Sequence, residues 1–593
     1  MWSRIPLFTS LRGYQGGWLR GDLLAGLTVW AVLVPEALAY AAIAGVSPVV
    51  GLYAAPGALL LYAAFGSSKH LVTGPMAATA ALSAAAVGEV AAGKSGMFAE
   101  LTVTLAIVTG LIALAAGLLR LGFVANFISE PVLKGFIVGL ALTIIVGQIP
   151  KLLGVKKGEG DFFSQLWFLV THLGQAKWLT IVVGLGSLAV VLILRRVAPV
   201  VPAPLVAVLA GIIVSYAFDL DKHGLDIVGH INGGLPSFGW PHVPRQDYLK
   251  LSGPAVGVML VGFAEGLGAA KTYATRSGYE INPNRELIGL GTANLAAGLS
   301  SGMVVNGSLS KTAVNGSAGA KTQVSGLVVA VLTVITLLFL TGLFTDLPEA
   351  TLAAVVVAAL IELVDFDALR ALYRASSARL TRIYGFAARA DFIAAVAAML
   401  GVLIFDTLPG LIIGVLDSLL LLTYRVSRPH VAVLGEIPGS GGQWADVEHH
   451  PGDHTVPGVS VLRVESGVFF ANADYVRTAI ERAAAADGTR AVVLDCETMP
   501  FVDVTAARMI DQLAALLARR GIRLVVAGEI GQVRDMVAAV AADGAPEYHR
   551  TVAEAVAAAR DPAAATGPAV VTDPAVATDP AVATDPATTD QEA

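Results

Sequence analysis

The sequence predicts an all-α polytopic membrane protein followed by a soluble α/β domain. Of its 593 residues, 55% are hydrophobic and only 14% are charged, and the mean hydropathy is +0.71. Soluble globular proteins average about 25% charged residues, so this composition favours a chain that lies largely in a bilayer. Stretches without Asp, Glu, Lys or Arg recur up to Arg428, and the sequence becomes polar after it.

The charge-free stretches are numerous enough for a bundle of spanning helices. A spanning helix needs about 20 mostly apolar residues. Residues 322–345 could supply one, and residues 37–68 the end of one and all of a second. Others are short or broken by Gly and Pro, which leaves their ends less well defined. A soluble protein would have to bury every one of these stretches in a single core, so a membrane domain over 21–428 is the better interpretation.

Lys and Arg gather in alternate connections between the apolar stretches. Cytoplasmic loops are the ones enriched in Lys and Arg, and the distribution favours a multi-pass plasma-membrane protein with both termini in the cytoplasm, residues 1–20 included. Two expected outer connections depart from this rule and hold Lys151, Lys156 and Lys157, and Lys222, Arg245 and Lys250. Both are long, and the rule is weaker for long loops.

The part after Arg428 has a different organisation. Residues 429–457 are rich in Gly, Pro, His and acids and are interpreted as a linker. Short β-branched stretches then alternate with amphipathic ones, which predicts an α/β domain over 458–560. The expected strands are 459–464, 491–494 and 524–527, and the expected helices are 473–486, 506–517 and 532–542. Near copies of P-A-V-x-T-D follow, and residues 561–593 are interpreted as a disordered acidic tail.

Three ionisable residues lie deep in apolar stretches: Glu36, Glu265 and Lys311. A charge at the centre of a bilayer costs about 2.5–3.5 kcal/mol on insertion scales, so such residues mark candidate functional sites. The alternative is structural: either acid could be a neutral carboxyl bonded to a neighbouring helix, and Lys311 could extend to the membrane surface. Pro35 beside Glu36, and the glycines around Glu265, predict interrupted helices in matching places of two halves, which is typical of inverted repeats with a midplane site.

Two further segments predict half-helices that begin in mid-membrane. Residues 73–77 and 306–311 each place Gly before helix-forming residues. Pro75 suits the first turn of a helix, and Ser308 suits an N-cap. The amide groups at such helix starts bind anions. Two helix ends of about +0.5 each, together with Lys311, give a site of about +2. This charge fits a dianion such as sulfate, or a monoanion beside one ionised carboxylate.

Other classes of function find no support in the sequence. The motifs H-E-x-x-H and G-x-S-x-G do not occur, the ten His form no obvious ligand set, and the single Cys496 excludes an internal disulfide and a Cys-based zinc site. No basic cluster resembles a nucleic-acid-binding surface. We therefore expect no enzymatic activity, cofactor, metal or nucleic-acid partner.

The chain resembles the sulfate permease (SulP) family, the bacterial relatives of the solute carriers that include prestin and pendrin. The resemblance covers roughly residues 10–428 and rests on P-E-A-L-A-Y-A (35–41), G-S-S-K-H-L-V-T-G-P (66–75), N-P-N-R-E-L-I-G-L-G-T-A-N (282–294), N-G-S-L-S-K-T-A-V (306–314) and G-A-K-T-Q (319–323). The soluble part resembles a STAS domain through V-V-L-D-C-E-T-M-P-F-V-D-V-T-A (492–506).

The resemblance implies fourteen helices in two inverted seven-helix repeats, about 21–220 and 250–428, with a core domain that moves against a gate domain in a homodimer. It places the anion at Pro75, Met76, Ala77, Ser308, Leu309, Ser310 and Lys311. Glu36, Tyr40 and Glu265 are then expected to line the same pocket. Most members have Arg in place of Lys311, and the lysine keeps the positive charge but lacks the bidentate geometry of arginine. Many have Gln in place of Glu36, and the acid here favours a proton-coupled type.

The leading hypothesis is proton-coupled sulfate uptake by an elevator-like alternating-access mechanism, with Glu36 and Glu265 as coupling residues. An ionised carboxylate repels the anion, and a bound anion favours the protonated carboxyl, so proton and anion would assist each other's binding. The alternatives are a sodium-coupled bicarbonate transporter, a proton-coupled dicarboxylate transporter, an uncoupled exchanger or channel, a nucleobase symporter of the same architecture, and a membrane-anchored signalling protein that works through its STAS domain and a cytoplasmic partner.

Thr505 occupies the position at which related anti-sigma-factor antagonists are phosphorylated, two residues after Asp503. This resemblance implies a regulatory site. The alternative is an ordinary helix start, with Asp503 as N-cap and Thr505 in the first turn.

Overall fold

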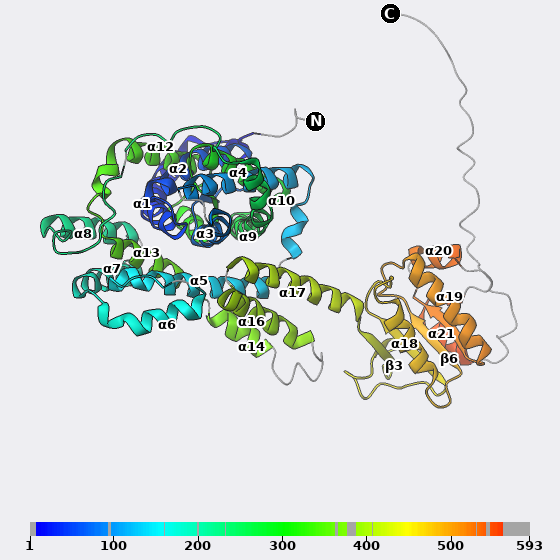
Figure 1. The fold of residues 1–593 in the computed structure, drawn as a ribbon. Coiled ribbons are helices and arrows are strands. Elements are labelled where there is room, and N and C mark those ends of the chain that lie inside the picture. The colour runs from blue at the N-terminus through cyan, green and yellow to red at the C-terminus, as the bar shows by residue number, and fades with distance from the viewer. Residues whose placement is uncertain are drawn as a thin grey trace, which may run out of the picture. The chain divides into compact units, whose positions relative to one another are not determined.

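The computed structural model describes residues 7–560 except 93–95, 128, 159, 199–200, 232, 362–363, 365, 376–386, 406, 529–530 and 541–545. The chain forms two compact units, Met1–Leu421 and Leu422–Ala593 (Figure 1). The expected disordered tail, 561–593, lies outside the described residues.

The first unit is helical, and its element order repeats once. The first half holds α1 (Leu19–Ile43), α2 (Pro48–Phe65), β1 (Val72–Gly74), α3 (Ala77–Ala91), α4 (Phe98–Leu118), α5 (Glu130–Leu153), the short α6 (Phe162–His172), α7 (Trp178–Val197) and α8 (Ala203–Ala217). The second holds α9 (Arg245–Ser277), α10 (Pro283–Leu299), β2 (Asn306–Ser308), α11 (Leu309–Ser317), α12 (Val324–Ile335), α13 (Glu349–Ile361), the short α14 (Phe366–Ala375), α16 (Ala387–Phe405) and α17 (Thr407–Ser427). Leaving out the two short helices, each described half has seven helices, as the resemblance implied.

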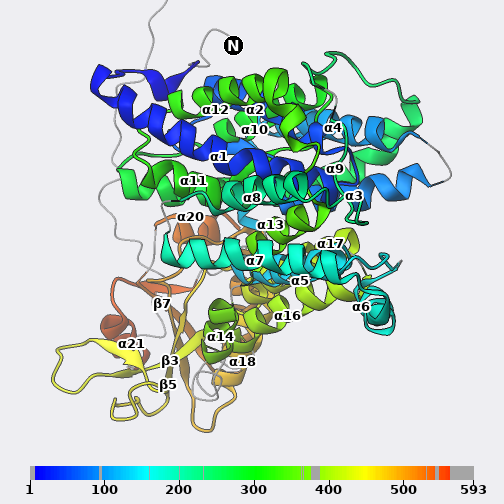
Figure 2. The same cartoon turned by 90° about the vertical axis from the view of Figure 1, so that its left-hand side faces the viewer.

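The helices of the first unit form two groups. Figures 1 and 2 show α1, α2, α4, α9, α10 and α12 bundled together, and α5, α7, α13 and α16 in a second group. Helix α1 joins the groups, because it packs on α2 and α12 on one side and on α8 and α13 on the other. The interior of α1 is therefore buried on most of its circumference, and a charged side chain there has to find a partner within the protein.

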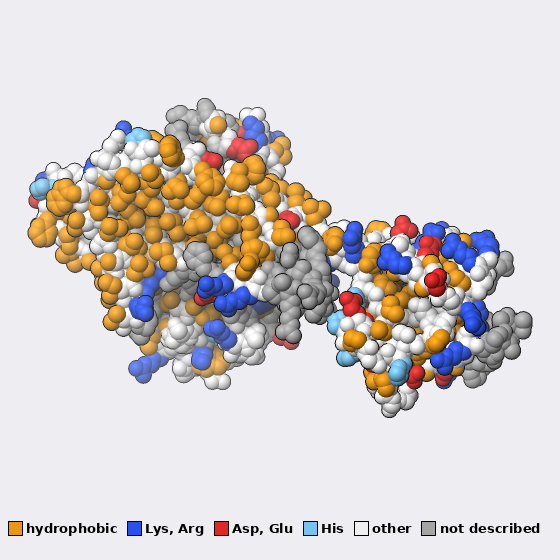
Figure 3. Space-filling model, turned by 90° about the horizontal axis from the view of Figure 1, so that it is seen from below, with side chains coloured by type: hydrophobic (Ala, Val, Ile, Leu, Met, Phe, Trp, Pro, Cys, Tyr) orange, Lys and Arg blue, Asp and Glu red, His pale blue; other side chains and the backbone are white. Residues whose placement is uncertain are grey.

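The outer surface of this unit is apolar. Eight of its described helices are long and apolar enough to cross a membrane. Side chains such as Trp178, Ile193, Ile213 and Tyr216 are exposed on α7 and α8. Figure 3 shows hydrophobic side chains covering a broad face of the unit, while Lys and Arg gather elsewhere. An apolar surface of this extent marks a contact with a membrane or another protein, and its place on helices of spanning length favours lipid.

Two details of the predicted helices were wrong. The interruptions expected at Pro35 and around Glu265 are absent, since α1 and α9 both run through unbroken. A proline removes one hydrogen bond from a helix, and in a transmembrane bundle the packing of neighbouring helices compensates for this loss. Pro75 is not in the first turn of a helix either, because Met76 is extended and α3 begins at Ala77.

The second unit is an α/β domain built on one six-stranded sheet. Its strands are β3 (Val431–Glu436), β4 (Trp444–Asp446), β5 (Val459–Val464), β6 (Ala491–Asp495), β7 (Arg523–Ala527) and β8 (Glu547–His549), and its helices are α18 (Ala473–Ala484), α19 (Val504–Arg519), α20 (Gly531–Val540) and α21 (Val552–Arg560). The order across the sheet is β4-β3-β5-β6-β7-β8, with β5 to β8 parallel. Alternate side chains of β5, β6 and β7 face α18–α20 on one side and α21 on the other.

The three expected strands and the expected helices 473–486 and 506–517 are confirmed, and so is the third expected helix up to residue 540, since 541–542 lie outside the described residues. The expected linker, 429–457, was wrong in part, because β3 and β4 lie within it and extend the sheet. In β3, Ala432 and Leu434 are buried while Val433 between them is exposed. This alternation is typical of a strand with one face against the core and one toward solvent. The Gly, Pro and His residues in the rest of 429–457 favoured a linker, so the short alternating pattern of β3 was not recognised as a strand.

Candidate functional site

A two-stranded pair in the middle of the first unit positions the starts of two short helices. Strand β1 pairs antiparallel with β2, and Val72 lies opposite Ser308 while Gly74 lies opposite Asn306. Helix α3 follows β1, and α11 follows β2 directly, so the two helices leave the pair from opposite ends. Both strands are fully buried. The arrangement brings two helix N-termini to one place, as predicted from residues 73–77 and 306–311.

Glycines allow the pair to pack closely against α9. A Cβ atom on Gly307 would lie 2.7 Å from Leu71 Cδ2 and 3.0 Å from Gly266 Cα. A Cβ on Gly266 would lie 3.1 Å from Asn306 Oδ1. Gly266, next to Glu265, therefore serves close backbone approach rather than a break in the helix.

The start of α3 offers unused hydrogen-bond donors. No side chain caps this helix, whereas Ser308 caps α11 by accepting from the backbone N–H of Lys311 at 3.3 Å. Ala77 and Ala78 are buried at 4% exposure each. The first N–H groups of a helix have no partner within the helix. In the described part of the chain, these donors are thus left for a ligand or water.

Lys311 lies beside these helix starts and does not reach the lipid. Its side chain is 1% exposed, and its Nζ lies 2.7 Å from Glu36 Oε2 on α1. The ammonium also donates to the carbonyl of Pro75 at 3.3 Å and lies 5.2 Å from the ring centroid of Tyr40. The structure therefore brings Glu36, Tyr40, Pro75 and Lys311 together, across a sequence separation of up to 275 residues.

The ion pair changes the charge expected for the site. With Glu36 ionised, the charge of Lys311 is balanced, and the two helix ends alone leave about +1 instead of about +2. An anion that binds here either interacts with the two helix ends alone, or it displaces Glu36 and pairs with Lys311 as well. Burying two charges is costly, and a buried pair is stable only when both partners are kept together.

The other predicted site residues surround this pair at different distances. Leu309 and Ser310, in the first turn of α11, are exposed, and the hydroxyl of Ser310 lies 3.2 Å from that of Ser308. The first turn of α11 is therefore accessible. Glu265 stands apart from Lys311, and its Oε2 accepts from Asn306 Nδ2 at 3.5 Å. Within the described chain it has no ion-pair partner, so the two predicted coupling acids have different surroundings.

Several buried polar residues that hold the strand pair in place were not assigned a role from the sequence. Asn294 on α10 exchanges two hydrogen bonds of 2.9 Å with the backbone of Val305, just before β2. Gln323 donates to the carbonyls of Ser68 and Leu71, just before β1. Both residues lie in stretches that carried the family resemblance. Their hydrogen bonds show that these stretches hold β1 and β2 in place.

A second set of contacts fixes the connection between α2 and β1. Glu286 Oε2 accepts from the hydroxyl of Tyr62 at 2.6 Å, and its Oε1 accepts from the hydroxyl and backbone N–H of Ser67 at 2.6 and 2.8 Å. This carboxylate is fully buried. Four protein donors, the fourth from the backbone of Ser68 at 3.1 Å, compensate its desolvation. Glu286 is therefore a structural acid.

In the second unit, Asp503 is the N-cap of α19. Its Oδ1 accepts from the backbone N–H of Ala506 at 2.8 Å, and its Oδ2 accepts from Phe470 N–H at 3.0 Å. Thr505 lies in the first turn of the helix and is exposed. The ordinary helix-start geometry is present, and the hydroxyl of Thr505 remains accessible.

Comparison with known proteins agrees with both units. The model of the sulfate permease family matches residues 19–385, and that of the STAS domain matches 450–555. A probable sulfate transporter of Mycobacterium tuberculosis (strain H37Rv) is 40% identical over 88% of this chain and 91% of its own length. High affinity sulfate transporter 1 of Stylosanthes hamata is 31% identical over 88% and 80%.

Solved structures share the fold. The murine anion transporter Slc26a9, in an inward-facing state, superposes with a TM-score of 0.84 at 22% identity, covering 94% of each chain. The transmembrane domain of the cyanobacterial bicarbonate transporter BicA superposes with a TM-score of 0.58 at 24% identity, covering 67% of this chain and 98% of its own.

Proposed function

The chain belongs to the sulfate permease family, and from this premise we propose that it carries a small oxyanion, sulfate, through the plasma membrane by proton-coupled secondary active transport. The observation that carries the proposal is the pairing of β1 with β2, which sets the starts of α3 and α11 beside Lys311. Its relatives in Mycobacterium tuberculosis and Stylosanthes hamata are named sulfate transporters, which supports sulfate as the substrate.

The binding step uses backbone donors and one ammonium. The uncapped N–H groups at Ala77 and Ala78 and the accessible first turn of α11 donate to the anion. The positive ends of the helix dipoles stabilise it without requiring a side chain. Lys311 supplies the remaining charge once its ion pair with Glu36 opens. Tyr40, which faces the ammonium, and Met76 complete the wall of the site.

The coupling step follows from the competition for Lys311. When Glu36 is ionised, it holds the ammonium at 2.7 Å and the anion gains little from it. When Glu36 takes up a proton, the pair loses its charge attraction and Lys311 is available to the anion. Proton and anion then favour each other's binding, which is the thermodynamic requirement for symport. Glu265, which has no cationic partner in the described chain, is the second candidate to carry the proton.

Transport requires that the site be reached from each side in turn. The two helix groups meet along α1, where Glu36 lies, so a displacement of one group against the other would move the site between the two surfaces. An elevator-like movement of this kind, in a homodimer with both termini in the cytoplasm, completes the proposal. Two halves of seven helices each put the two ends of the membrane unit on the same side, which supports that orientation.

The test is radiolabelled sulfate uptake into proteoliposomes, with and without an inward proton gradient and with and without sodium. Uptake stimulated by the proton gradient and indifferent to sodium is the expected result. Stimulation by sodium alone would identify a sodium-coupled transporter, and uptake indifferent to both gradients would identify an exchanger or channel. An excess of bicarbonate or a dicarboxylate in the same assay shows whether sulfate is the preferred anion.

For the STAS domain we propose that Thr505 is a regulatory phosphorylation site, because it is exposed in the first turn of a helix, where a phosphate would lie near the positive end of the helix dipole. Intact-mass analysis of protein from its native cells tests this. The absence of any phosphorylated species, under both sulfate-replete and sulfate-starved growth, would exclude the role.

A further inference from the structure

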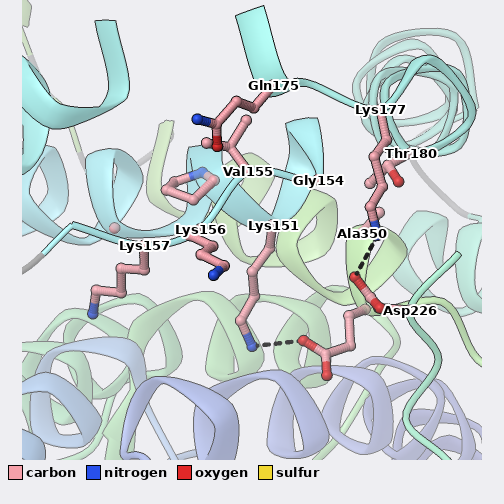
Figure 4. A pocket seen from close by; sticks show the side chains of 13 residues that line it. Lys151, Gly154, Val155, Lys156, Lys157, Gln175, Lys177, Thr180, Asp226 and Ala350 are labelled. Carbon is pink, nitrogen blue, oxygen red and sulfur yellow. Dashed lines mark ion pairs between the residues drawn. The ribbon is translucent and has the colours of Figure 1, made fainter. Parts of the chain in front are cut away.

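A lysine-lined cavity lies away from the strand pair, where α5 ends and α7 and α13 begin. Its volume is about 540 Å³, and it is lined by Lys151, Lys156, Lys157, Lys177, Asp226 and Glu349, with smaller residues between them. Figure 4 shows Lys151, Lys156 and Lys157 extending from the end of α5 and the loop after it, with Lys177 across the cavity. Of these four, Lys151, Lys156 and Lys157 are the lysines that the sequence placed on the outer side as exceptions to the charge rule.

The cavity has more positive than negative charge. Lys151 pairs with Glu349 at 3.0 Å, and Lys177 pairs with Asp226 at 3.6 Å. Lys156 and Lys157 have no ion-pair partner among the described residues. Four lysines against two carboxylates leave two positive charges in excess in the described lining. Both ion pairs are partly exposed to solvent and therefore weak, so an anion can replace either carboxylate at small cost.

The local backbone is built to hold these side chains together. Gly154 ends α5 with φ +68°, and the backbone N–H of Lys177 then donates to the carbonyl of Leu153 at 2.9 Å. A Cβ on Gly147 would lie 3.9 Å from the Nζ of Lys157, so the ammonium lies directly over the surface of α5. The lysines are thus held around one space by a glycine turn and a helix surface.

A second cavity shares part of its lining with the first. Its volume is about 270 Å³, and Lys151 and Glu349 line both cavities. It is also lined by Ala39 of α1, next to Tyr40 and about one turn from Glu36, and by Gln148 of α5. Gln148 is 8% exposed and lines this cavity, so its side-chain amide can donate a hydrogen bond to a ligand there.

We propose that the two cavities form an outer vestibule that binds a tetrahedral dianion of the sulfate type before it reaches the central site. The anion first binds to Lys156, Lys157 and Lys177. The ion pair between Lys151 and Glu349 separates this first cavity from the second. After that pair has opened, Gln148 donates a hydrogen bond to the anion. The inference rests on the proposed function in one respect, because it takes this face as the outer one.

The first test is the Michaelis constant for external sulfate in proteoliposomes, with Lys157→Gln and Lys222→Gln as matched variants. Lys222 lies on the same expected outer face, outside the cavity, and loses the same charge. Lys157→Gln is expected to raise the Michaelis constant about three- to tenfold at low ionic strength, with little change in maximal rate, and the difference should shrink in high salt. Equal effects of the two variants would overturn the proposal.

The second test does not depend on transport. Purified full-length protein is treated with a membrane-impermeant amine reagent, and labelling of each lysine is measured by mass spectrometry with and without sulfate at constant ionic strength. Sulfate is expected to protect Lys156 and Lys157 and to leave Lys222 unprotected. Uniform protection, or none, would exclude the vestibule. If sulfate uptake by the unaltered protein is absent while protection is seen, the proposed function fails and the vestibule stands.

Discussion

The Nζ of Lys311 lies 2.7 Å from Oε2 of Glu36, and both side chains are almost completely buried. One residue belongs to the half-helix α11 and the other to the continuous helix α1. The pair joins the candidate binding site to the candidate proton carrier, so the two functions share one cation. A family member with Gln in place of Glu36 would lack this connection.

The first prediction concerns the stability of the pair. Replacing one partner leaves the other charge buried and unpaired, which is expected to cost about 3–5 kcal/mol of unfolding free energy. Lys311→Met and Glu36→Gln should each lower the thermal unfolding midpoint of the purified protein, and the double variant should recover most of the loss. If both single variants unfold at the temperature of the unaltered protein, the pair is not a stabilising contact.

The second prediction concerns proton coupling. Glu265→Gln is expected to reduce the stimulation of sulfate uptake by an inward proton gradient, because the amide cannot take up a proton and only Glu36 remains to carry it. Glu130→Gln is the control, since Glu130 is 77% exposed at the start of α5 and should leave the stimulation intact. Unchanged pH dependence in Glu265→Gln would remove this residue from the coupling mechanism.

The third prediction concerns the close approach of α9 to the strand pair. Gly266→Ala would place a Cβ 3.1 Å from Asn306 Oδ1 and should reduce sulfate affinity about tenfold, a loss of about 1.4 kcal/mol. Gly268→Ala is the matched control, because no heavy atom lies within 4 Å of its Cβ position. Equilibrium binding to the two purified variants distinguishes them, and equal affinities would contradict the packing argument.

The fourth prediction concerns the STAS domain. Asp503→Ala removes the N-cap of α19 and should lower the stability of this domain by about 0.5–2 kcal/mol. Asp487→Ala, at an exposed position outside the helices, is expected to have little effect. The stability of both variants is measured by denaturant titration of the full-length protein, with hydrogen exchange of the α19 amides as the readout. Unchanged exchange in Asp503→Ala would mean that the cap does not stabilise the helix.

What the sequence predicts well in this chain is local. Ser308 as a helix cap, the three parallel strands from 459 to 527 and the burial of Lys311 all follow from residues within one turn or one strand. The partners of Lys311 and of β1 do not follow from local residues, because Glu36 lies 275 residues from Lys311 and Ser308 is paired with Val72. The family resemblance alone placed Glu36 in the same pocket as Lys311. No local pattern encodes a contact of that separation.

The errors have the same origin. Pro35 carries a helix-breaking signal, and the bundle around α1 overrides it. Strands β3 and β4 are short, and only the sheet to which they pair stabilises them. The positioning residues Asn294 and Gln323 were visible as polar residues in apolar stretches, the signal that had identified Glu36. Lys151, Lys156 and Lys157 of the cavity were visible as departures from the charge rule for outer loops, whereas Lys177 was not.

The central claim is that anions bind at the starts of α3 and α11 with the help of Lys311. The most direct measurement is equilibrium binding of radiolabelled sulfate to the purified protein and to Lys311→Ala at two pH values. Sulfate should bind the unaltered protein more tightly at the lower pH, because the proposed proton uptake frees the ammonium for the anion, and should not bind Lys311→Ala measurably. Binding of sulfate to Lys311→Ala with unchanged affinity and pH dependence would contradict the account.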